Sequence, residues 1–574
     1  MASSNTLVVA IDFGTTYSGY AYSLKSDTTN VKTANKWPSK LDSQKTPTSI
    51  LLTPERKLHS FGYDAEEHYA ELLEDDKAEN WALFRRIKMV LYREKELSEH
   101  TEIWDVTGTV NMPAMDIFSM AIKFLKDHAT DTVKDPMNTG KEGQNITESD
   151  IFFILTVPAI WDDSARLFMR KAAVRAGIPE ANLGLALESE AASIWCQNIP
   201  LVVSKGQNND LSTIGAKYMV VDIGGGTADI TVHEKQSDGN LRELCWASGG
   251  DWGGTKVDEE FLRMLEGLMG KAAVERFKRE CMADLFDLLR QFEMVKRTTD
   301  PKLDGKLKIR LPESLRDISR DANKSAFMNS LLKSIKAFQN EGLSVEKDKM
   351  RIDANKAREM FAYSVDGMCT KMRNILSNPK AAGVEHILVV GGFSDSPVVR
   401  EALKKNFTDV FLIFPPEPSL AVLKGAVLYG HKPQIIASRI AKFTYGLEYT
   451  DDFDVSKHTK KYRTNINGKP MCEKLFQILV KKGDTVINGQ EVAIQSQPPL
   501  DEHNFMTYEM YLCTKPHPMY VDEPECKKYG TVRTRLTPDD LAVETVLIIK
   551  DTDMSIEIKH VKSGKSETKH FDFM

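Results

Sequence analysis

Two stretches of this chain repeat one pattern, in which an apolar run ends in an acid, a glycine–threonine turn follows, and a second apolar run begins. The first stretch spans residues 8–20 and the second spans residues 220–232. Each is typical of a β-hairpin with a small, hydroxylic tip. Such a tip lets backbone N–H groups approach a phosphate, because glycine has no Cβ, and the acid is placed to hold a hydrated Mg²⁺. One copy alone is equally consistent with an ordinary β-turn, but two copies favour a phosphate site.

The repetition predicts an α/β fold with two similar lobes, whose hairpins meet across a nucleotide cleft. A third glycine turn, at residues 387–394, joins another strand to a helix that begins near Pro397. We expect the first lobe over residues 1–217 and the second over residues 218–435. Residues 397–430 are expected to pack back toward the first lobe.

The last part of the chain has a different character. Residues 440–574 carry short alternating runs separated by Gly, Pro, Asn or Asp, which is the pattern of an all-β sandwich. The expected strands are Leu475–Val480, Met506–Leu512, Gly530–Leu536, Glu544–Ile549, Ile556–His560 and Thr568–Phe573. This β-rich domain is expected to lack a helical lid.

Hydrophobic periodicity predicts most of the remaining elements. Helical spacing covers Asp64–Tyr92, Met115–His128, Ser164–Ala176 and the long region Asp258–Met372. Ile151–Val157 is an apolar run typical of a buried strand, which Pro158 ends. Two polar segments, Thr130–Ser149 and Ser204–Ser212, are expected to be surface loops.

Composition limits the classes of partner. The 574 residues carry a net charge of −6, are 41% hydrophobic and 28% charged, and show no basic stripe, which argues against nucleic acid or an anionic membrane. The longest apolar stretch, Ile151–Trp161, is too short to insert across a bilayer. The seven cysteines form no CxxC pair, and the first residues lack the features of a signal peptide, so we expect free thiols and a cytoplasmic location.

The chain also carries a set of recognisable motifs: Asp12–Ser18, Val157–Ala159, Glu188–Ala192, Asp222–Asp229 and Val390–Gly392. Together they resemble the 70-kDa heat shock chaperone family, which has an actin-like (duplicated RNase H-like) ATPase fold. The stretches Lys45–Lys57 and His59–Gly62 resemble the divergent 12A/12B branch of that family. The resemblance covers residues 7–430 and continues more weakly into the β-rich tail. It implies ATP or ADP as ligand, Mg²⁺ as metal, and protein partners or clients.

The resemblance assigns roles to individual residues. It implies a first phosphate loop of Gly14, Thr15, Thr16 and Tyr17, and a second of Gly224, Gly225, Gly226 and Thr227. The implied catalytic residues are Asp12, Glu188, Asp222 and Thr227, with Asp12 and Asp222 holding Mg²⁺ through water. Carboxylates of this kind orient a water and neutralise charge instead of forming a covalent bond. Taken alone, Glu188 is more simply explained as an acid at a helix N-terminus.

The resemblance also implies an adenosine site and a switch. Glu293, Lys296 and Arg297 match the adenosine-binding helix, and Gly391 and Gly392 match the turn that adenine approaches. On adjacent helical turns, these charged groups can hydrogen-bond ribose and stack a guanidinium on adenine. Taken alone, the charged cluster is more simply a solvated helix face. Pro158 and Arg166 match the family's interdomain switch.

Several positions depart from the family pattern. Glu66 stands where ordinary members have a lysine for the γ-phosphate, a role that Lys88 or Arg85 could take over. Asp395 stands where an arginine stacks on adenine, and residues 431–441 replace the usual acidic linker. We therefore expect nucleotide binding with slow or negligible hydrolysis.

Three functions are compatible with these patterns. The leading one is a divergent chaperone-like protein that uses its ATP or ADP state to regulate a protein interaction. The second is a pseudo-ATPase scaffold or adaptor, which the acids at Glu66 and Asp395 favour. The third is a small-molecule kinase, because sugar and glycerol kinases share the duplicated hairpins, although the β-rich tail argues against it.

Overall fold

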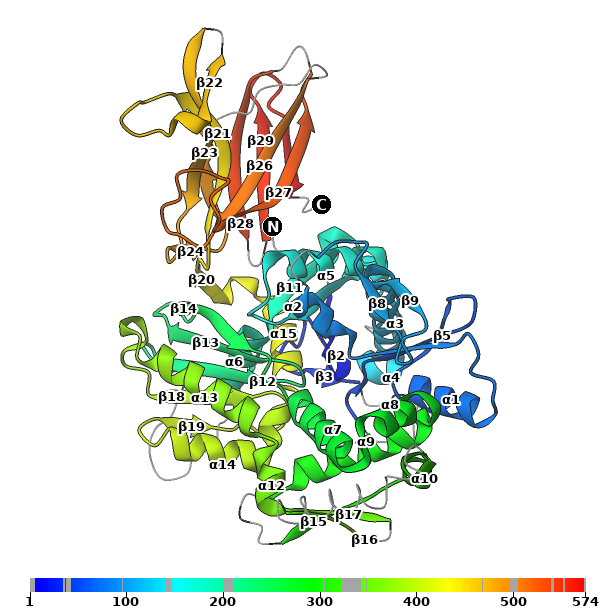
Figure 1. Cartoon of the computed structure of the whole chain (residues 1–574). Helices are drawn as coiled ribbons and strands as arrows, with labels where there is room; N and C mark the ends of the chain where they lie inside the picture. Colours follow the sequence, from blue (N-terminus) through cyan, green and yellow to red (C-terminus); the bar gives the residue numbers. More distant parts are fainter. Residues whose placement is uncertain are drawn as a thin grey trace. The chain divides into compact units, whose positions relative to one another are not determined.

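In the computed structural model the chain forms two compact units, most of the second being coloured yellow to red in Figure 1. The first unit comprises Met1–Trp161, Phe168–Thr231 and Ser248–Lys432, and the second comprises Asp162–Leu167, Val232–Ala247 and Pro433–Met574. The structure describes residues 6–571 except 35–36, 38–42, 95–96, 141–145, 200–210, 301, 303–304, 322–341, 347, 467, 496–503, 538–540 and 551–552.

The opening apolar run forms the centre of one sheet. The strands of this sheet are β1 (Leu7–Asp12), β2 (Tyr17–Leu24), β3 (Lys32–Thr33), β4 (Thr46–Pro47), β10 (Ile151–Val157) and β11 (Leu183–Leu187). Their order is β11-β10-β1-β2-β3, with β4 paired to β2. β1 pairs antiparallel with β2 and parallel with β10. Every residue of β1 is buried, so this strand has a continuous apolar run instead of an alternating one.

A second sheet repeats this topology. The part of this sheet that repeats the first comprises β12 (Lys217–Ile223), β13 (Ala228–Lys235), β14 (Leu241–Gly250), β18 (His386–Val390) and β19 (Phe411–Ile413), and the sheet continues beyond β14 through β20 (Ile436–Ile440) and β24 (Thr485–Ile487). The order β19-β18-β12-β13-β14 matches the order of the first sheet strand by strand. β18 and β19 run parallel to β12, the first strand of the second hairpin, as β10 and β11 run parallel to β1 in the first sheet. The repeated sequence pattern therefore corresponds to a repeated arrangement of strands.

Two helices pack closely on the first sheet. α15 (Ala421–His431) contacts α6 (Glu188–Gln197), β1 and β10. A Cβ built on Gly425 would lie 1.7 Å from the backbone oxygen of Ala191, and one on Gly430 would lie 2.5 Å from a methyl of Val8. The two helix backbones can approach this closely only because glycine has no side chain.

Replacing Gly425 with alanine should lower the free energy of unfolding of the first unit by about 3 kcal/mol, because the new methyl group meets a backbone atom that cannot rotate away. Thermal unfolding of the purified chain measures the change. Gly305→Ala is the matched control, since no atom lies within 4 Å of a Cβ built there. Equal stability of the two variants would contradict this account of the α6–α15 contact.

The other helices of the chain follow in order, and most of them are labelled in Figure 1. They are α1 (Tyr63–Glu74), α2 (Val90–Arg93), α3 (Ala114–Lys134), α4 (Pro136–Thr139), α5 (Asp163–Arg175), α7 (Thr255–Met269), α8 (Lys271–Glu280), α9 (Met282–Thr298), α10 (Glu313–Asp321), α12 (Ala354–Glu359), α13 (Ala362–Leu376) and α14 (Pro397–Asn406). The predicted helices Met115–His128 and Ser164–Ala176, the strand Ile151–Val157 and the helix start at Pro397 are confirmed.

The prediction of helix from Asp64 to Tyr92 is wrong in its second half. α1 ends at Glu74, and β7 (Ala82–Arg85) pairs antiparallel with β5 (Ser49–Leu52). The other edge of β5 pairs with β6 (Leu58–Phe61). Asp76 and Asn80 have φ values of 56° and 63°, a left-handed conformation that interrupts the helix. Of the apolar side chains in this second half, Phe84 lies in the short strand β7, Ile87 in a 3-10 turn, and Leu91 in the separate helix α2.

The long helical region predicted from Asp258 to Met372 is also interrupted. A three-stranded antiparallel sheet, β15-β17-β16, lies within it, formed by β15 (Lys306–Arg310), β16 (Leu343–Glu346) and β17 (Lys349–Asp353). In β15 the apolar residues Leu307 and Ile309 alternate with charged ones. That period of two is the strand pattern, which the surrounding charged helices obscured.

The two predicted polar loops have different outcomes. In Thr130–Ser149, α3 continues to Lys134 and α4 follows, with the Asp135 side chain accepting a hydrogen bond from the Met137 N–H. That part of the loop prediction is wrong, because residues 130–134 bury Thr130 and Val133 on the inner face of α3. Most of the predicted loop Ser204–Ser212 lies outside the described residues.

The second unit is built mainly from antiparallel strands. A five-stranded sheet has the order β22-β23-β21-β26-β27, and a four-stranded sheet has the order β25-β28-β29-β30. The strands from residue 436 onward are β20 (Ile436–Ile440), β21 (Thr444–Asp452), β22 (Arg463–Ile466), β23 (Lys469–Val480), β24 (Thr485–Ile487), β25 (Gln490–Ala493), β26 (Phe505–Cys513), β27 (Cys526–Arg535), β28 (Val543–Lys550), β29 (Asp553–His560) and β30 (Ser566–His570). Each predicted run overlaps one of these strands, although the end of Thr568–Phe573 lies outside the described residues.

One hydrophobic core joins the two sheets of this unit. Tyr508 of β26 and Leu547 of β28 are both fully buried in it. The hydroxyl groups of Tyr508 and Thr545 are hydrogen-bonded at 2.7 Å, which satisfies the one polar atom that the tyrosine brings into the core. Across the described residues of the whole chain, no helix is both long enough and apolar enough to cross a membrane.

Candidate functional site

The first hairpin tip is held in a fixed shape by its neighbours. Asp12 ends β1, and the tip runs to Thr16 before β2 begins. The Thr48 hydroxyl donates to the Gly14 carbonyl at 2.8 Å, and the Thr48 N–H donates to the Thr16 carbonyl at 2.9 Å. A Cβ on Gly14 would lie 2.1 Å from the Tyr17 carbonyl oxygen, so only glycine fits this turn.

The second hairpin tip is closed by its own backbone and by the segment that follows β14. The Gly224 N–H donates to the Thr227 carbonyl at 2.9 Å. The N–H groups of Gly254 and Thr255 donate to the Gly224 and Gly225 carbonyls at 3.1 and 2.8 Å. The start of α7 is therefore fixed to this tip.

The two tips touch one another directly. A Cβ on Gly225 would lie 2.4 Å from the Thr16 hydroxyl oxygen, and one on Gly226 would lie 2.6 Å from the Thr15 hydroxyl oxygen. The structure thus brings together both sets of residues that the resemblance assigns to phosphate binding. Glycine is required at Gly225 and Gly226 because the hydroxyl groups of the opposite tip occupy the space of a side chain.

Four carboxylates cluster beneath the tips, all of them buried or nearly so: Asp12, Glu188, Asp222 and Asp229. Burial raises the pKa of Asp222 well above its ordinary value, and the charges of Glu188, Asp229 and Asp12 raise it further. Burial also raises the pKa of Glu188 to about 7, against the opposing effect of Lys88. Burial therefore disfavours the ionised form of both groups, and the neighbouring acids disfavour it further.

Lys88 supplies one of the two cations that face this cluster. It lies in a short helical turn, Ile87–Met89, and its side chain is only 3% exposed. Its Nζ atom is 2.7 Å from Glu188 Oε1 and 5.1 Å from the centre of the Trp161 ring. Of the two replacements considered for the missing lysine, Lys88 is therefore the one that reaches an acid of the site.

Lys45 supplies the other cation, and the sequence did not suggest it. Its Nζ atom lies 2.6 Å from Asp12 Oδ2, while the Thr156 hydroxyl donates to Asp12 Oδ1 at 2.9 Å. Burial is the largest influence on the pKa of Asp12 and raises it, but Lys45, Lys88 and the hydrogen bonds outweigh burial and lower the pKa overall. Both carboxylate oxygens of Asp12 are thus engaged.

Asp229 is an acid that sequence reasoning missed as a site residue. Its Oδ1 atom accepts a hydrogen bond from the Ile160 N–H at 2.9 Å, and its Oδ2 atom accepts one from the Thr227 hydroxyl at 2.9 Å. It therefore joins the second hairpin to the segment that follows Pro158. Its position in the motif Asp222–Asp229, on the inner side of β13, was the available signal.

Glu66 is engaged elsewhere in the first unit. Its Oε1 atom accepts a hydrogen bond from the Ser49 hydroxyl at 2.7 Å and lies 2.8 Å from Arg85, while Arg290 lies 3.5 Å from Oε2. Glu66 is 3% exposed, so these partners neutralise a buried charge. Arg85, which was the other candidate cation, is thereby paired with Glu66.

The predicted adenosine residues lie on α9, next to the second hairpin. Lys296 Nζ is 2.7 Å from Asp258 and 2.5 Å from Glu293, and it is buried. Arg297 Nε is 2.7 Å from Glu293, and its guanidinium carbon lies 5.8 Å from the centre of the Tyr17 ring. Burial raises the pKa of Glu293, but Lys296 and Arg297 outweigh it and lower the pKa overall. The charges of Lys296 and Glu293 are therefore largely committed to each other.

The glycine turn at Gly391 and Gly392 meets the acid cluster. Gly391 has a φ of 87°, and a Cβ there would lie 2.3 Å from Asp222 Oδ1, so a side chain is excluded by both conformation and space. Asp395, which follows the turn, is 2.7 Å from Arg400. Burial raises the pKa of Asp395 although Arg400 and Arg297 oppose it.

The two predicted switch residues lie in different units. Pro158 follows β10 in the first unit, and its carbonyl accepts a hydrogen bond from the Trp161 N–H at 3.3 Å. Arg166 belongs to the second unit, where its Nη1 atom is 3.3 Å from Asp163 Oδ1. The Tyr445 hydroxyl donates to Asp163 Oδ2 at 2.9 Å in the same unit. Coupling between Pro158 and Arg166 stays a prediction.

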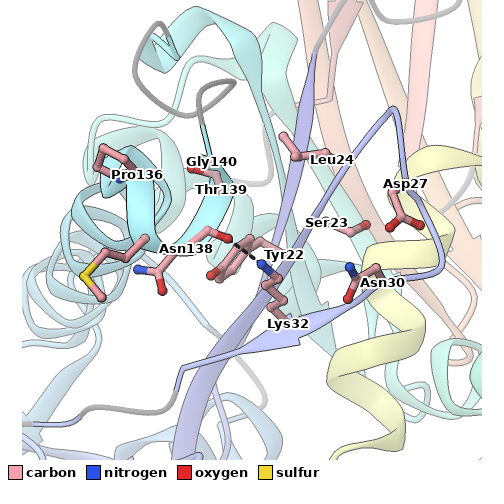
Figure 2. Close-up of a pocket in the computed structure, with 11 residues that line it drawn as sticks. Tyr22, Ser23, Leu24, Asp27, Asn30, Lys32, Pro136, Asn138, Thr139 and Gly140 are labelled. Atoms are coloured by element: carbon pink, nitrogen blue, oxygen red, sulfur yellow. Dashed lines mark hydrogen bonds between the residues drawn. The ribbon is translucent and has the colours of Figure 1, made fainter.

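A cavity of about 200 Å³ also lies in the first unit, between β2 and α4 (Figure 2). Figure 2 shows Lys32 on one side and Asn138 on the other, joined by a hydrogen bond from the Lys32 ammonium to the Asn138 carbonyl. None of the predicted site residues lines this cavity. The candidate nucleotide site is therefore defined by the hairpin tips and the acids beneath them.

Comparisons with known proteins show what this chain is similar to. The model of the Hsp70 protein family matches residues 76–466. Human heat shock 70 kDa protein 12A is 31% identical over 630 aligned positions, which cover 99% of this chain and 91% of that protein. Human heat shock 70 kDa protein 12B is 30% identical and covers 100% of this chain and 91% of its own length. The chaperone protein DnaK of Metamycoplasma hominis is 22% identical over 59% of this chain and 49% of its own.

These matches confirm the family resemblance that the motifs indicated, and they include the second hairpin, the glycine turn and α9. The family match covers more than half of the chain, and the 12A protein is matched along nearly its whole length. This chain belongs to the Hsp70 family.

Proposed function

We propose that this chain binds ATP or ADP with Mg²⁺ between its two hairpin tips, and that the bound nucleotide regulates the binding of a protein partner. The observation that carries this proposal is the meeting of two glycine–threonine tips above four buried carboxylates. The tips offer backbone N–H groups and hydroxyls for phosphates, and the acids offer negative charge for a metal. The names of the relatives, heat shock and chaperone proteins, support the same assignment.

The residues present fit a hydrated magnesium ion. Neighbouring acids add to the effect of burial in raising the pKa values of Glu188 and Asp222, and a divalent cation beside them would favour their ionised forms. Among the described residues no three acids, histidines or cysteines lie close enough to ligate a metal directly. Mg²⁺ in proteins usually keeps several waters and is bound through one or two carboxylates. Asp12 and Asp222 would hold the ion in this way. When bound, Mg²⁺ neutralises charge on the phosphates.

Hydrolysis by this site is proposed to be slow. Glu188 is the candidate general base, because a carboxyl with a pKa of about 7 can accept a proton from water at neutral pH. Both nearby lysines, however, are bound to carboxylates, Lys88 to Glu188 and Lys45 to Asp12. A cation held by a carboxylate at 2.6–2.7 Å stabilises developing phosphate charge less than a free one does.

The pH dependence of hydrolysis should report Glu188. The ionised fraction of a carboxyl with a pKa of about 7 increases about tenfold between about pH 6 and pH 8, so the single-turnover rate should rise by the same factor. Single-turnover assays with radiolabelled ATP measure the profile. The Glu188→Gln variant should show a flat profile at a much lower rate, and a wild-type profile that is flat or falls with pH would exclude Glu188 as the base.

The partner-binding part of the proposal rests on the second unit. Its two sheets share a single core and resemble a peptide-binding sandwich in Phe443–Gly446 and Gly530–Leu536. The proposal is therefore a chaperone-like role for a cytoplasmic protein, in which the nucleotide state changes affinity for an extended polypeptide segment.

Calorimetric titration with ATP and ADP, with and without Mg²⁺, is the direct test. We expect saturable heat at one site per chain, tighter binding with Mg²⁺, and a higher melting temperature at saturating nucleotide. A chemically unfolded, carboxymethylated polypeptide then serves as the probe for partner binding in each nucleotide state. Equal probe affinity in all states would remove the regulatory part of the proposal while leaving nucleotide binding intact.

A scaffold that does not use nucleotide is the second candidate. It is favoured by the Lys45–Asp12 ion pair and by the contact between the two tips, because both arrangements satisfy the site from within the chain. Absence of both a heat signal and a thermal shift with every nucleotide tested would support this candidate against the first.

A further inference from the structure

Two cysteines lie directly opposite one another in the second unit. Cys513 is the last residue of β26 and Cys526 is the first residue of β27, and the register of the two antiparallel strands makes them partners. Both are reduced in the structure. Neither residue belongs to the candidate nucleotide site, so their chemistry does not depend on the proposed nucleotide binding.

The hydrogen bonds around the pair define its geometry. The Thr514 N–H donates to the Glu525 carbonyl at 3.2 Å, and the Cys526 N–H donates to the Glu523 carbonyl at 2.9 Å. The two cysteines therefore form a non-hydrogen-bonded pair of the ladder, in which Cα atoms lie about 4.5 Å apart and side chains are closest. That separation falls within the range that a disulfide spans, about 4.4–6.8 Å.

The two thiols share one small apolar environment. Cys513 is fully buried with Phe476 and Val521, and Cys526 packs against the same cluster while remaining half-buried. Burial raises the pKa of the Cys526 thiol, and the neighbouring Cys513 thiol raises it further. The second of these effects requires the two sulfur atoms to lie close together. The half-buried Cys526 is the sulfur that a small reagent reaches first.

The pair stands at the base of the connecting segment 514–525, which is bound to the β22–β23 hairpin. The Tyr520 ring stacks on the Tyr462 ring with centres 3.9 Å apart, and the Tyr462 hydroxyl donates to Asp522 at 2.7 Å. The Val521 N–H donates to the Lys474 carbonyl at 2.9 Å. A covalent bond between the cysteines would therefore restrain a segment that organises one end of the second unit.

We propose that Cys513 and Cys526 form a reversible disulfide, which makes the segment 514–525 of the second unit a thiol–disulfide switch. Oxidation restrains the segment against the β22–β23 hairpin, and reduction releases it to open locally. The oxidant is a low-molecular-weight disulfide.

The exchange proceeds in two balanced steps. The Cys526 thiolate attacks one sulfur of the small disulfide, forming a mixed disulfide and expelling one small thiolate. The Cys513 thiolate then attacks the Cys526 sulfur, forming the protein disulfide and expelling the second small thiolate. Two protein thiols lose two protons and two electrons, and the small disulfide becomes two thiols. Because the pKa of Cys526 is raised, its thiolate is scarce at neutral pH and the first step accelerates as pH rises.

The test incubates the folded full-length chain with oxidised glutathione at pH 8 and maps its non-reduced peptides by mass spectrometry. We expect one linked peptide pair that joins Cys513 to Cys526 and disappears on reduction with dithiothreitol. Amide hydrogen exchange in the segment 514–525 should slow by about tenfold in the oxidised chain, because local opening is restrained. Exchange in the hairpin tips at Gly14 and Gly225 should not change.

Two variants make the test specific. Cys526→Ser should abolish the linked pair, whereas Cys281→Ser should leave it, since Cys281 is another cysteine of intermediate exposure but lies in the first unit. If the Cys526→Ser variant folds poorly, the peptide map of the wild-type chain still shows whether Cys513 and Cys526 become linked. Glutathione retained on Cys526, a linkage of Cys526 to any other cysteine, or unchanged exchange in 514–525 after linkage would each overturn the proposal.

Discussion

Replacing Lys88 with methionine should lower the single-turnover rate of ATP hydrolysis by about 100-fold or more. Methionine keeps most of the apolar length of the lysine, so the packing against Trp161 survives while the charge beside Glu188 is lost. Without Lys88, Glu188 loses a charge and a hydrogen bond that oppose the effects of burial, Asp12 and Asp229, so its pKa rises further and it is protonated at neutral pH. A protonated carboxyl cannot accept a proton from water.

The matched control is Lys126→Met. Lys126 is also a buried lysine, 5% exposed as a residue, but it lies on α3 and pairs with Asp127 and Glu148, away from both tips. We expect this variant to hydrolyse ATP at the wild-type rate. A Lys88→Met variant that binds Mg-ATP and hydrolyses it at the wild-type rate would show that Lys88 is not needed to keep Glu188 ionised.

Glu66 and Lys88 show that matching this chain to the family pattern position by position does not identify the cation of the site. The sequence places Glu66 at the position of a cation, and from that alone a loss of positive charge at the site is the natural prediction. In the structure Glu66 is bound to Ser49 and Arg85, and the cation that reaches the acids comes from Lys88. Substituting Glu66 by lysine would place a like charge beside Arg85 and Arg290 and would not add a cation beside Glu188.

Strands could be predicted from the sequence where burial of both faces gives a continuous run of apolar residues, or burial of one face gives an alternating run. β1 and β12 are such strands, and the acids Asp12 and Asp222 at or near their ends could be named from the sequence because the pattern occurs twice. β7 was missed because a short strand inside a helical region is decided by its pairing partner, whereas β15 was missed although its own residues alternate, because charged helical segments flank it. Such pairing is not visible in the local sequence.

The sequence predicted the phosphate loops of the site, but only some of its charged residues. Lys45 lies within the stretch Lys45–Lys57 that indicated the branch of the family, yet nothing in the spacing of that stretch connects it to Asp12. Their contact exists because β4 pairs with β2 and so brings Lys45 to the first hairpin. Residues that complete a site through such tertiary pairing follow from the fold and not from a motif.

Because buried acids are crowded together at the site, their ionisation destabilises the fold. A carboxyl whose pKa is raised in the folded state destabilises the fold wherever it is ionised in the unfolded chain. For Asp222 this cost is absent below its ordinary pKa of 3.8, and it increases as pH rises toward the pKa of the folded state. Above that value the cost stays at its maximum. The chain therefore retains Asp222 at the expense of its stability, which is expected of a residue that binds a cation.

Replacing Asp222 with asparagine should therefore have opposite effects on stability and on binding. The melting temperature of the nucleotide-free chain should rise by a few degrees at pH 7, and the difference from wild type should vanish as pH falls below 3.8. Affinity for Mg-ATP should fall by about 100-fold, equivalent to roughly 2.7 kcal/mol, because one of two acids proposed to hold the hydrated metal is lost. Calorimetry and thermal unfolding measure the two quantities on the same sample. If the substitution only improved packing, stability would rise without a loss of affinity for Mg-ATP. If Asp222 had only a structural role, stability would fall. Either result would contradict the assignment of Asp222 to a metal–nucleotide site.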